Sequence, residues 1–181
     1  MRVVKIFAIT SIVSLWIWSQ SVYEYAVPKI AGGNQPLAVY QGKKLLVVTL
    51  PVIQNAQADS LLYCLDTLAT AHSQQLVVIA SPSIEDGFTS EQRSQLRTWY
   101  ESKLSSSIVL TDGLYTRKTS GVQQHPLFSW LTNSELNENF DMDVAGPWHK
   151  FFINGSGQLY GVLRPHTRIS SQAVNKTLNM Q

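Results

Sequence analysis

Sulfur chemistry in this chain can rest on one residue only, because Cys64 is the single cysteine among 181 residues. One cysteine cannot close a disulfide within the chain, so both a stabilising disulfide and a CxxC redox pair are excluded. Cys64 stands between Leu62 and Leu65 in an amphipathic stretch, and no Lys or Arg lies near it in sequence to stabilise a thiolate. Free cysteine is among the most buried residue types, so the sequence favours a packing role over a redox role.

The other side chains that could do acid–base or metal chemistry are a carboxylate pair and four histidines. Glu85 and Asp86 are adjacent, and a carboxylate dyad would permit general acid–base catalysis. Their position in a polar stretch favours the simpler interpretation, a solvated loop. The histidines have neither an HxH nor an HxxxH spacing; they are His72, His125, His149 and His166. We therefore predict no metal site and no cofactor.

The composition excludes some kinds of partner. The net charge is +2, charged residues make up 14% of the chain, and the Lys and Arg residues are scattered. Nothing in this pattern predicts a nucleic-acid interface, which needs a concentrated basic patch. Hydrophobic residues make up 44% of the chain, enough for one well-formed core. We expect the partner to be a protein or a small-molecule ligand that the sequence does not identify.

Residues 1–20 have the pattern of an export signal. A short basic start is followed by an apolar run at 6–18 and then by small residues. This run is shorter than the roughly 20 residues that a membrane-spanning helix needs, so we predict a cleaved signal peptide. Trp16 and Trp18 would suit a membrane interface, which keeps an uncleaved membrane anchor as the alternative. A buried N-terminal helix is a third interpretation. The first two predict an exported protein, periplasmic or extracellular, or a membrane-anchored one.

The remaining residues, 21–181, alternate apolar strands with amphipathic helices. Continuous apolar runs bounded by turn residues predict core strands at 45–50 and 75–80. Between them we expect a helix that is capped by Asp59 and ends near His72. A strand–helix–strand unit with a connection of this length forms a parallel, right-handed crossover.

Further elements flank this unit. Alternation at 21–27 and turn residues at 30–36 predict an extra N-terminal β-hairpin. Downstream we expect a helix with a Thr89–Gln92 capping box, a strand at 107–110, a helix at 125–131, an irregular stretch at 132–145, an antiparallel hairpin at 148–163 and a helix at 170–178. This order is that of a thioredoxin-like α/β sandwich, and we see no second domain.

Four stretches of the chain, in the right order, resemble the glutathione peroxidase family. They are 21–25, 40–48, the His-Pro-Leu-Phe-Ser-Trp-Leu segment at 125–131, which is the most specific, and 150–157. The resemblance covers most of the chain after the N-terminal segment. It implies a thioredoxin-like fold and, as the family's activity, reduction of peroxides by a cysteine or selenocysteine.

The same resemblance implies that the family's reactive residues have been lost here. It places the peroxidatic sulfur at Gln54, counted from the core strand, or at Ala56, counted from the helix. It places the family's glutamine at Glu85 and its tryptophan–asparagine pair at Gly146 and Pro147. Such chemistry needs a thiolate and donors that stabilise the thiolate and the leaving oxygen, and none of these positions keeps the family's residue. Because thioredoxin-like domains often carry a cis-proline beside the active site, we expect a cis peptide bond before Pro147.

Two functions from different classes follow. The first is an exported domain of the glutathione peroxidase type without peroxidase activity, which binds a ligand in the old cleft or on its surface. Trp148 and Phe88 are candidates to line a pocket near that cleft. The alternative is a thiol-dependent peroxidase or oxidoreductase that acts through Cys64. The loss of sulfur from the family's position favours the first hypothesis.

Overall fold

A computed structural model describes residues 20–180 of the chain. The predicted signal or anchor segment lies, except for Gln20, outside the described residues. Among residues 20–180, no helix combines the length and the apolar character that crossing a membrane requires.

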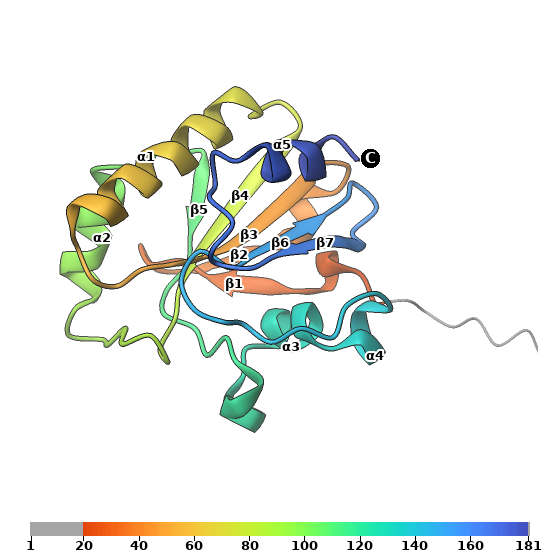
Figure 1. The fold of residues 1–181 in the computed structure, drawn as a ribbon. Helices are drawn as coiled ribbons and strands as arrows, with labels where there is room; N and C mark the ends of the chain where they lie inside the picture. The colour runs from red at the N-terminus through yellow and green to blue at the C-terminus, as the bar shows by residue number, and fades with distance from the viewer. Residues whose placement is uncertain (1–19, 181) are drawn as a thin grey trace, which may run out of the picture.

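A five-stranded sheet forms the centre of the domain, with helices on both faces (Figure 1). Its strand order is β5-β4-β3-β6-β7. The parallel part consists of β3 (Lys44–Leu50), β4 (Leu76–Pro82) and β5 (Ile108–Leu110), and the antiparallel part consists of β6 (Lys150–Ile153) and β7 (Leu159–Leu163). The predicted core strands and the predicted late hairpin are therefore confirmed, and all belong to one sheet.

The helices divide between the two faces of this sheet (Figure 1). On one face lie α1 (Ala56–Ala71), α2 (Arg93–Glu101) and α5 (Gln172–Leu178), and on the other lie α3 (Pro126–Thr132) and α4 (Ser134–Asn137). Since β3 and β4 are covered on both faces, almost every side chain along them is buried. This explains why their sequences read as continuous apolar runs rather than as alternating ones.

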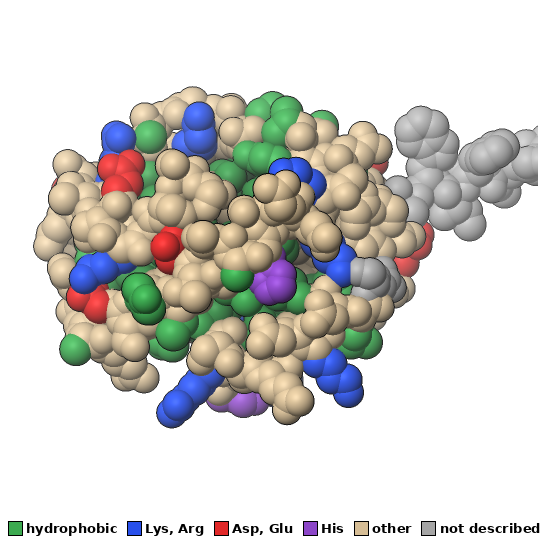
Figure 2. All heavy atoms as spheres, turned by 90° about the horizontal axis from the view of Figure 1, so that it is seen from above, with side chains coloured by type: hydrophobic (Ala, Val, Ile, Leu, Met, Phe, Trp, Pro, Cys, Tyr) green, Lys and Arg blue, Asp and Glu red, His purple; other side chains and the backbone are tan. Residues whose placement is uncertain are grey.

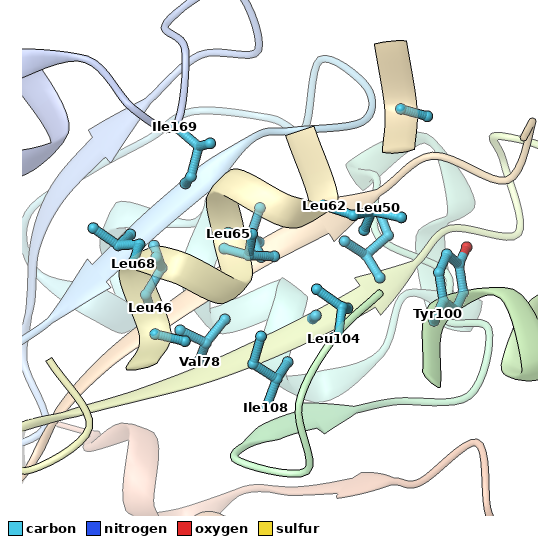
Figure 3. Close-up of a cluster of buried hydrophobic side chains, with 14 of the residues drawn as sticks. Leu46, Leu50, Leu62, Leu65, Leu68, Val78, Tyr100, Leu104, Ile108 and Ile169 are labelled. Carbon is cyan, nitrogen blue, oxygen red and sulfur yellow. The ribbon is translucent and has the colours of Figure 1, made fainter. Parts of the chain in front are cut away.

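The larger of the two core clusters lies between α1 and the sheet. Leu65 and Leu68 of α1 pack against Leu46 and Val78 of the central strands (Figure 3). Ile169, from the loop before α5, closes one side of the same cluster and is only 2% exposed. This loop and α1 are therefore held against each other by the core itself.

Two predicted helix caps are wrong. The N-cap of α1 is Asn55, whose side chain accepts a hydrogen bond from the backbone N–H of Ala58 at 2.8 Å. Asp59 lies within the first turn, where its carboxylate instead accepts the indole N–H of Trp99 at 2.7 Å. The predicted Thr89 capping box does not form, because α2 begins later and Gln92, at its N-cap, makes no side-chain hydrogen bond there. Helix α1 therefore begins earlier than predicted and α2 begins later.

The N-terminal part of the domain also differs from the predicted strand at 21–27. Val22–Glu24 forms a short 3-10 helix, because Ser21 and Glu24 cap each other reciprocally. After it, β1 (Ala26–Pro28) pairs antiparallel with β2 (Asn34–Pro36) as a separate two-stranded sheet. A second 3-10 helix, Leu37–Tyr40, then leads toward β3.

Candidate functional site

The first wall of the candidate site is the N-terminal end of α1. Asn55, Gln57 and Ala58 supply this wall. Gln54 and Ala56, the two positions predicted for a lost sulfur, are exposed on either side of the capping residue Asn55 but do not belong to this wall. Asn55 receives the backbone N–H groups of Ala58 and Asp59 through its side chain and its carbonyl. The first N–H groups of any helix lack an acceptor within the helix, so this end of α1 presents positive dipole charge.

The second wall is the chain reversal before β6. Thr49, fully buried at the end of β3, donates its hydroxyl to the carbonyl of Gly146 at 2.7 Å and accepts the N–H of His149 at 3.0 Å. Its own carbonyl accepts the N–H of Trp148 at 2.7 Å. These bonds hold Trp148 in the left-handed region, at φ 69°, which a bulky residue adopts only when its surroundings require it.

The predicted cis bond before Pro147 is wrong, because no peptide bond in the described part of the chain is cis. The chain turns instead through the positive φ angles of Gly146, at 129°, and Trp148. Glycine tolerates this conformation without strain, so the reversal does not need a cis-proline.

These two walls enclose a cavity of about 430 Å³, which we call the helix-end cavity. The loop 165–169 forms its third side. Apolar surface comes from Leu61, Trp148 and Ile169, together with three prolines. Phe88, expected near the same pocket, lines a different hollow beside Asp112. The structure therefore brings together α1, Pro147 and Trp148, and leaves Phe88 elsewhere.

Electrostatically, the helix-end cavity is positive. Within the described part of the chain, the only ionisable side chains that line it are His166 and Arg168, and no carboxylate does. Neither of the two has an ion-pair partner among residues 20–180. The sequence signal is the absence of any Asp or Glu after Asp143, although four Lys or Arg residues follow it. Arg168 was not among the residues predicted from the sequence, although this asymmetry points to it.

Glu85, the position predicted for the family's glutamine, does not line this cavity. Its carboxylate turns toward the loop after β5 and accepts the backbone N–H groups of Thr116 and Arg117 at 3.0 and 2.9 Å. Ser83 donates to it at 2.6 Å, and Ser120 donates as well. Burial raises its pKa, but hydrogen bonds from Ser120, Ser83, Arg117 and Thr116 outweigh burial and lower the pKa to about 2. Glu85 is thus a permanently charged anchor for this loop.

Asp86 does not form a catalytic dyad with Glu85. It is paired with Arg117, and both side chains are largely covered. Burial raises the pKa of Asp86, the Arg117 charge opposes this, and the neighbouring Glu85 charge adds to it. Glu85 and Asp86 therefore hold the loop after β4 against the loop after β5.

Cys64 also lies outside the helix-end cavity. It is partly buried on α1, two turns beyond the helix start, about 12 Å from Ala56 along the helix axis. It lines a second hollow, also of about 430 Å³, between α1 and the start of α5; we call this the α1–α5 groove. Cys64 packs against the main core cluster, as the sequence favoured, but one side of it faces this groove.

Two buried basic residues next to the chain reversal were not predicted. Lys150, fully buried, donates its ammonium group to the carbonyls of Trp148 and Arg164, and burial lowers its pKa to about 8. His149 points to the other face of the sheet and stacks on Phe151 at 4.8 Å. Burial lowers its pKa to about 4, helped by the charges of Lys150 and Arg164 and opposed by Asp143. Because burial lowers both pKa values, the stability of this region should depend on pH.

The sequence matches no protein-family model and no curated protein. Solved structures do resemble the chain. An apo structure of a protein named Trgpx aligns with a TM-score of 0.65 at 19% identity, over 88% of this chain and 94% of that one. T. cruzi GPX1 aligns with a TM-score of 0.62 at 16% identity, over 88% and 94%. The exposed lipoprotein thioredoxin Etrx1 of Streptococcus pneumoniae aligns with a TM-score of 0.54 at 19% identity, over 85% and 96%.

These similarities show a thioredoxin-like fold, in agreement with the predicted fold class. At such low identities the fold is shared while the activity does not transfer. The structural neighbours include glutathione peroxidase-like proteins and thiol–disulfide oxidoreductases.

Proposed function

We propose that this protein is a binding protein without thiol catalysis, and that it takes a small organic anion in the helix-end cavity. The observation that carries the proposal is the cavity's lining: apolar walls, Arg168 and His166 without carboxylate partners, and no sulfur. An anion bound there would gain from Arg168 and from the positive end of α1. Trp148 and Leu61 would cover the apolar part of the ligand.

The absence of a nucleophile supports the non-catalytic part of the proposal. Among residues 20–180, Thr167 supplies the only side-chain hydroxyl in the cavity lining, and no hydrogen bond joins it to His166, the one side chain there that could act as its general base. Export of the protein, or its attachment to a membrane through residues 6–18, remains part of the proposal and rests on the sequence pattern alone.

Calorimetric titration with benzoate and with benzyl alcohol, its uncharged analogue, tests this function. We expect benzoate to bind and benzyl alcohol to bind at least tenfold more weakly, because only the anion interacts with Arg168. Arg168→Gln should weaken benzoate binding about five- to tenfold, in line with about 1 kcal/mol for an exposed charge-assisted hydrogen bond. Arg97→Gln is the matched control, since Arg97 lies on α2 and is paired with Glu101.

Equal binding of benzoate and benzyl alcohol would contradict the proposal. So would benzoate binding that Arg168→Gln leaves unchanged, or no binding of any carboxylate up to millimolar concentration.

The second candidate function is a thiol-dependent oxidoreductase acting through Cys64. The observation that favours it is the exposure of one side of Cys64 to the α1–α5 groove, which would give a small substrate access. Hydrogen peroxide consumption with dithiothreitol as reductant, measured for the wild type and for Cys64→Ser, decides between the two. On our proposal both proteins consume peroxide at the rate of dithiothreitol alone. A fast wild-type rate that Cys64→Ser abolishes would establish the enzyme instead.

A further inference from the structure

We infer that the ligand is a single-chain amphiphilic carboxylate, whose head occupies the helix-end cavity and whose acyl chain lies along α1 in the α1–α5 groove. This inference rests on the proposed function and extends it by naming the ligand class. It treats the helix-end cavity and the α1–α5 groove as two parts of one ligand site.

The first observation is that the two hollows share a lining residue and a helix. Both contain Ile169, and both run along the same helix. The residues that α1 contributes include Gln57, Leu61, Cys64 and Leu68, at spacings of four, three and four residues. Such residues lie on one face of a helix, so the hollows follow each other in line. From Gln57 to His72 this face is about 22 Å long, which exceeds the length of an extended twelve-carbon chain.

The chemistry of the groove favours an acyl chain over a peptide. Its long wall is a helix, whose backbone N–H and C=O groups are already paired within α1. An extended peptide lying there would exchange hydrogen bonds with water for an apolar wall, at considerable cost. An acyl chain has no such groups, and it would cover the exposed side of Cys64.

The positions of the charged side chains determine which end of the ligand lies in the cavity. Arg168 and His166 stand at the cavity end, whereas the groove has one ionisable imidazole, His72, and no Lys or Arg. No carboxylate among residues 20–180 lines either hollow. The acidic residues of α1 face the other way, since Asp59 and Asp66 are both bonded to residues 99–105, in and after α2. Figure 2 shows the side of the molecule on which α1 and α5 lie, where hydrophobic side chains reach the surface between polar ones. An anionic head therefore belongs at the N-terminal end of α1.

The single cysteine gives a direct readout, because it lies in the groove and not in the cavity. We would measure the alkylation rate of Cys64 by iodoacetamide in the full chain, with butanoate or with dodecanoate below its micelle concentration. Dodecanoate at saturation should slow alkylation at least fivefold, because its chain covers the thiol. Butanoate fills only the cavity and should leave the rate unchanged. Dodecyltrimethylammonium, with the same chain and the opposite charge, should not protect.

A blocked groove supplies the second measurement. Cys64→Phe places a ring in the middle of the groove and leaves the cavity lining intact. By calorimetry, dodecanoate should bind the wild type at least tenfold more tightly than butanoate, and Cys64→Phe should remove this advantage without changing butanoate binding. Thr70→Phe is the matched control, since Thr70 is exposed on the same helix and lines neither hollow. Arg168→Gln should weaken both carboxylates by the same factor.

The outcomes separate the inference from the proposed function. If benzoate and butanoate bind through Arg168 but dodecanoate neither binds more tightly nor protects Cys64, the inference is wrong and the cavity remains a site for small anions. Equal protection by dodecyltrimethylammonium would also overturn the inference, because the head would then not be selected by charge. If no carboxylate binds at all, both fail.

Discussion

At the scale of single residues, burial sets the protonation of two basic residues beside the site. Lys150 and His149 are adjacent, yet they point to opposite faces of the sheet and are both buried without a carboxylate partner. Each is held by the backbone: Lys150 by two carbonyls, and His149 by the N–H of Ala145 at 3.1 Å. Burial disfavours the charged form of a base, so both residues make the stability of the fold depend on pH.

The lowered pKa of Lys150 predicts that the free energy of unfolding rises between pH 8 and 10.5. Its pKa is about 8 in the folded protein and 10.5 when unperturbed, so between these values the unfolded chain binds more protons and stability rises with pH. The rise is at most about 3 kcal/mol, from 1.36 kcal/mol per pKa unit. Urea unfolding between pH 8 and 10.5 should show it in the wild type and in Lys176→Met, whose side chain is exposed. A Lys150→Met protein with the same rise would show that another group is responsible.

At the scale of elements, the two ends of the site are fixed by different devices. The start of α1 is set by a side-chain cap, Asn55, while the reversal before β6 is set by the hydroxyl and backbone of Thr49. A third device, the Glu85 carboxylate, organises the loop after β5 on the far side of β4. Asn55, Thr49 and Glu85 each use a polar side chain to hold backbone groups that no helix or sheet hydrogen bond holds. A single substitution at any of the three should therefore disturb the local backbone.

Glu85→Gln is expected to destabilise the protein and not to rebuild a peroxidase site. The amide would place an N–H₂ group among backbone N–H and hydroxyl donors, leaving part of the cluster without acceptors. We expect a loss of about 2 kcal/mol in the free energy of unfolding at pH 7. Thermal unfolding checks this, with Glu135→Gln in α4 as the control. Unchanged stability would mean that the loop is held by other contacts.

Restoring sulfur at the start of α1 should give an activated thiol without a peroxidase. In a Cys64→Ser background, Ala56→Cys places a thiol within the first turn of α1, and Gln54→Cys places it just before the cap. The helix N-terminus favours the thiolate, so the pKa of the thiol that Ala56→Cys introduces should lie below the ordinary value of about 8.5. Alkylation rates against pH measure it, and Ile53→Cys, exposed in the preceding loop, is the control.

An Ala56→Cys thiol that titrates like the control would contradict the assignment of this helix end as the old sulfur position. Peroxide turnover should stay low in either variant, since Glu85 is turned away and no indole or amide donor replaces the family's residues at Gly146 and Pro147.

At the scale of the whole molecule, acidic and basic residues are distributed differently along the sequence. The acidic residues lie before residue 144 and include those that fix loops, whereas the later part of the chain carries only basic charges and supplies one side of the helix-end cavity. The fold is thioredoxin-like and is shared with solved structures over most of the described chain. On the proposed function, this fold carries a positively charged binding site in place of a thiol site, which is possible because fold and site are separable.

The whole fold should be sensitive to acid in two steps. His149 has a folded pKa of about 4 against 6.5 unperturbed, so stability falls as pH drops from 6.5 to 4. Glu85, about 2 against 4.5, extends the loss from pH 4.5 to 2. His149→Phe should reduce the first step and leave the part due to His125, whose pKa burial also lowers. The substitution should cost about 1 kcal/mol at pH 7 for the lost bond to Ala145. Urea unfolding at pH 4, 5.5 and 7 checks this; an unchanged slope in the variant would exclude His149.

The sequence by itself determined the features that depend on neighbours along the chain. Apolar runs located β3 and β4, the Asn154–Gly157 turn located the β6–β7 hairpin, and the single cysteine excluded an intramolecular disulfide or CxxC pair. These follow from periodicity, turn chemistry and composition, which are local properties.

Only the tertiary structure decided which side chains meet. Glu85 reaches residues 31 and 32 positions away, Thr49 holds a segment about a hundred positions away, and Ile169 joins two hollows along α1. Such contacts depend on how elements pack, and no local pattern encodes a partner so distant in sequence. The predicted cap at Asp59 was wrong because α1 begins one turn earlier, at Asn55; the Asp59 carboxylate instead accepts the indole N–H of Trp99, 40 positions away.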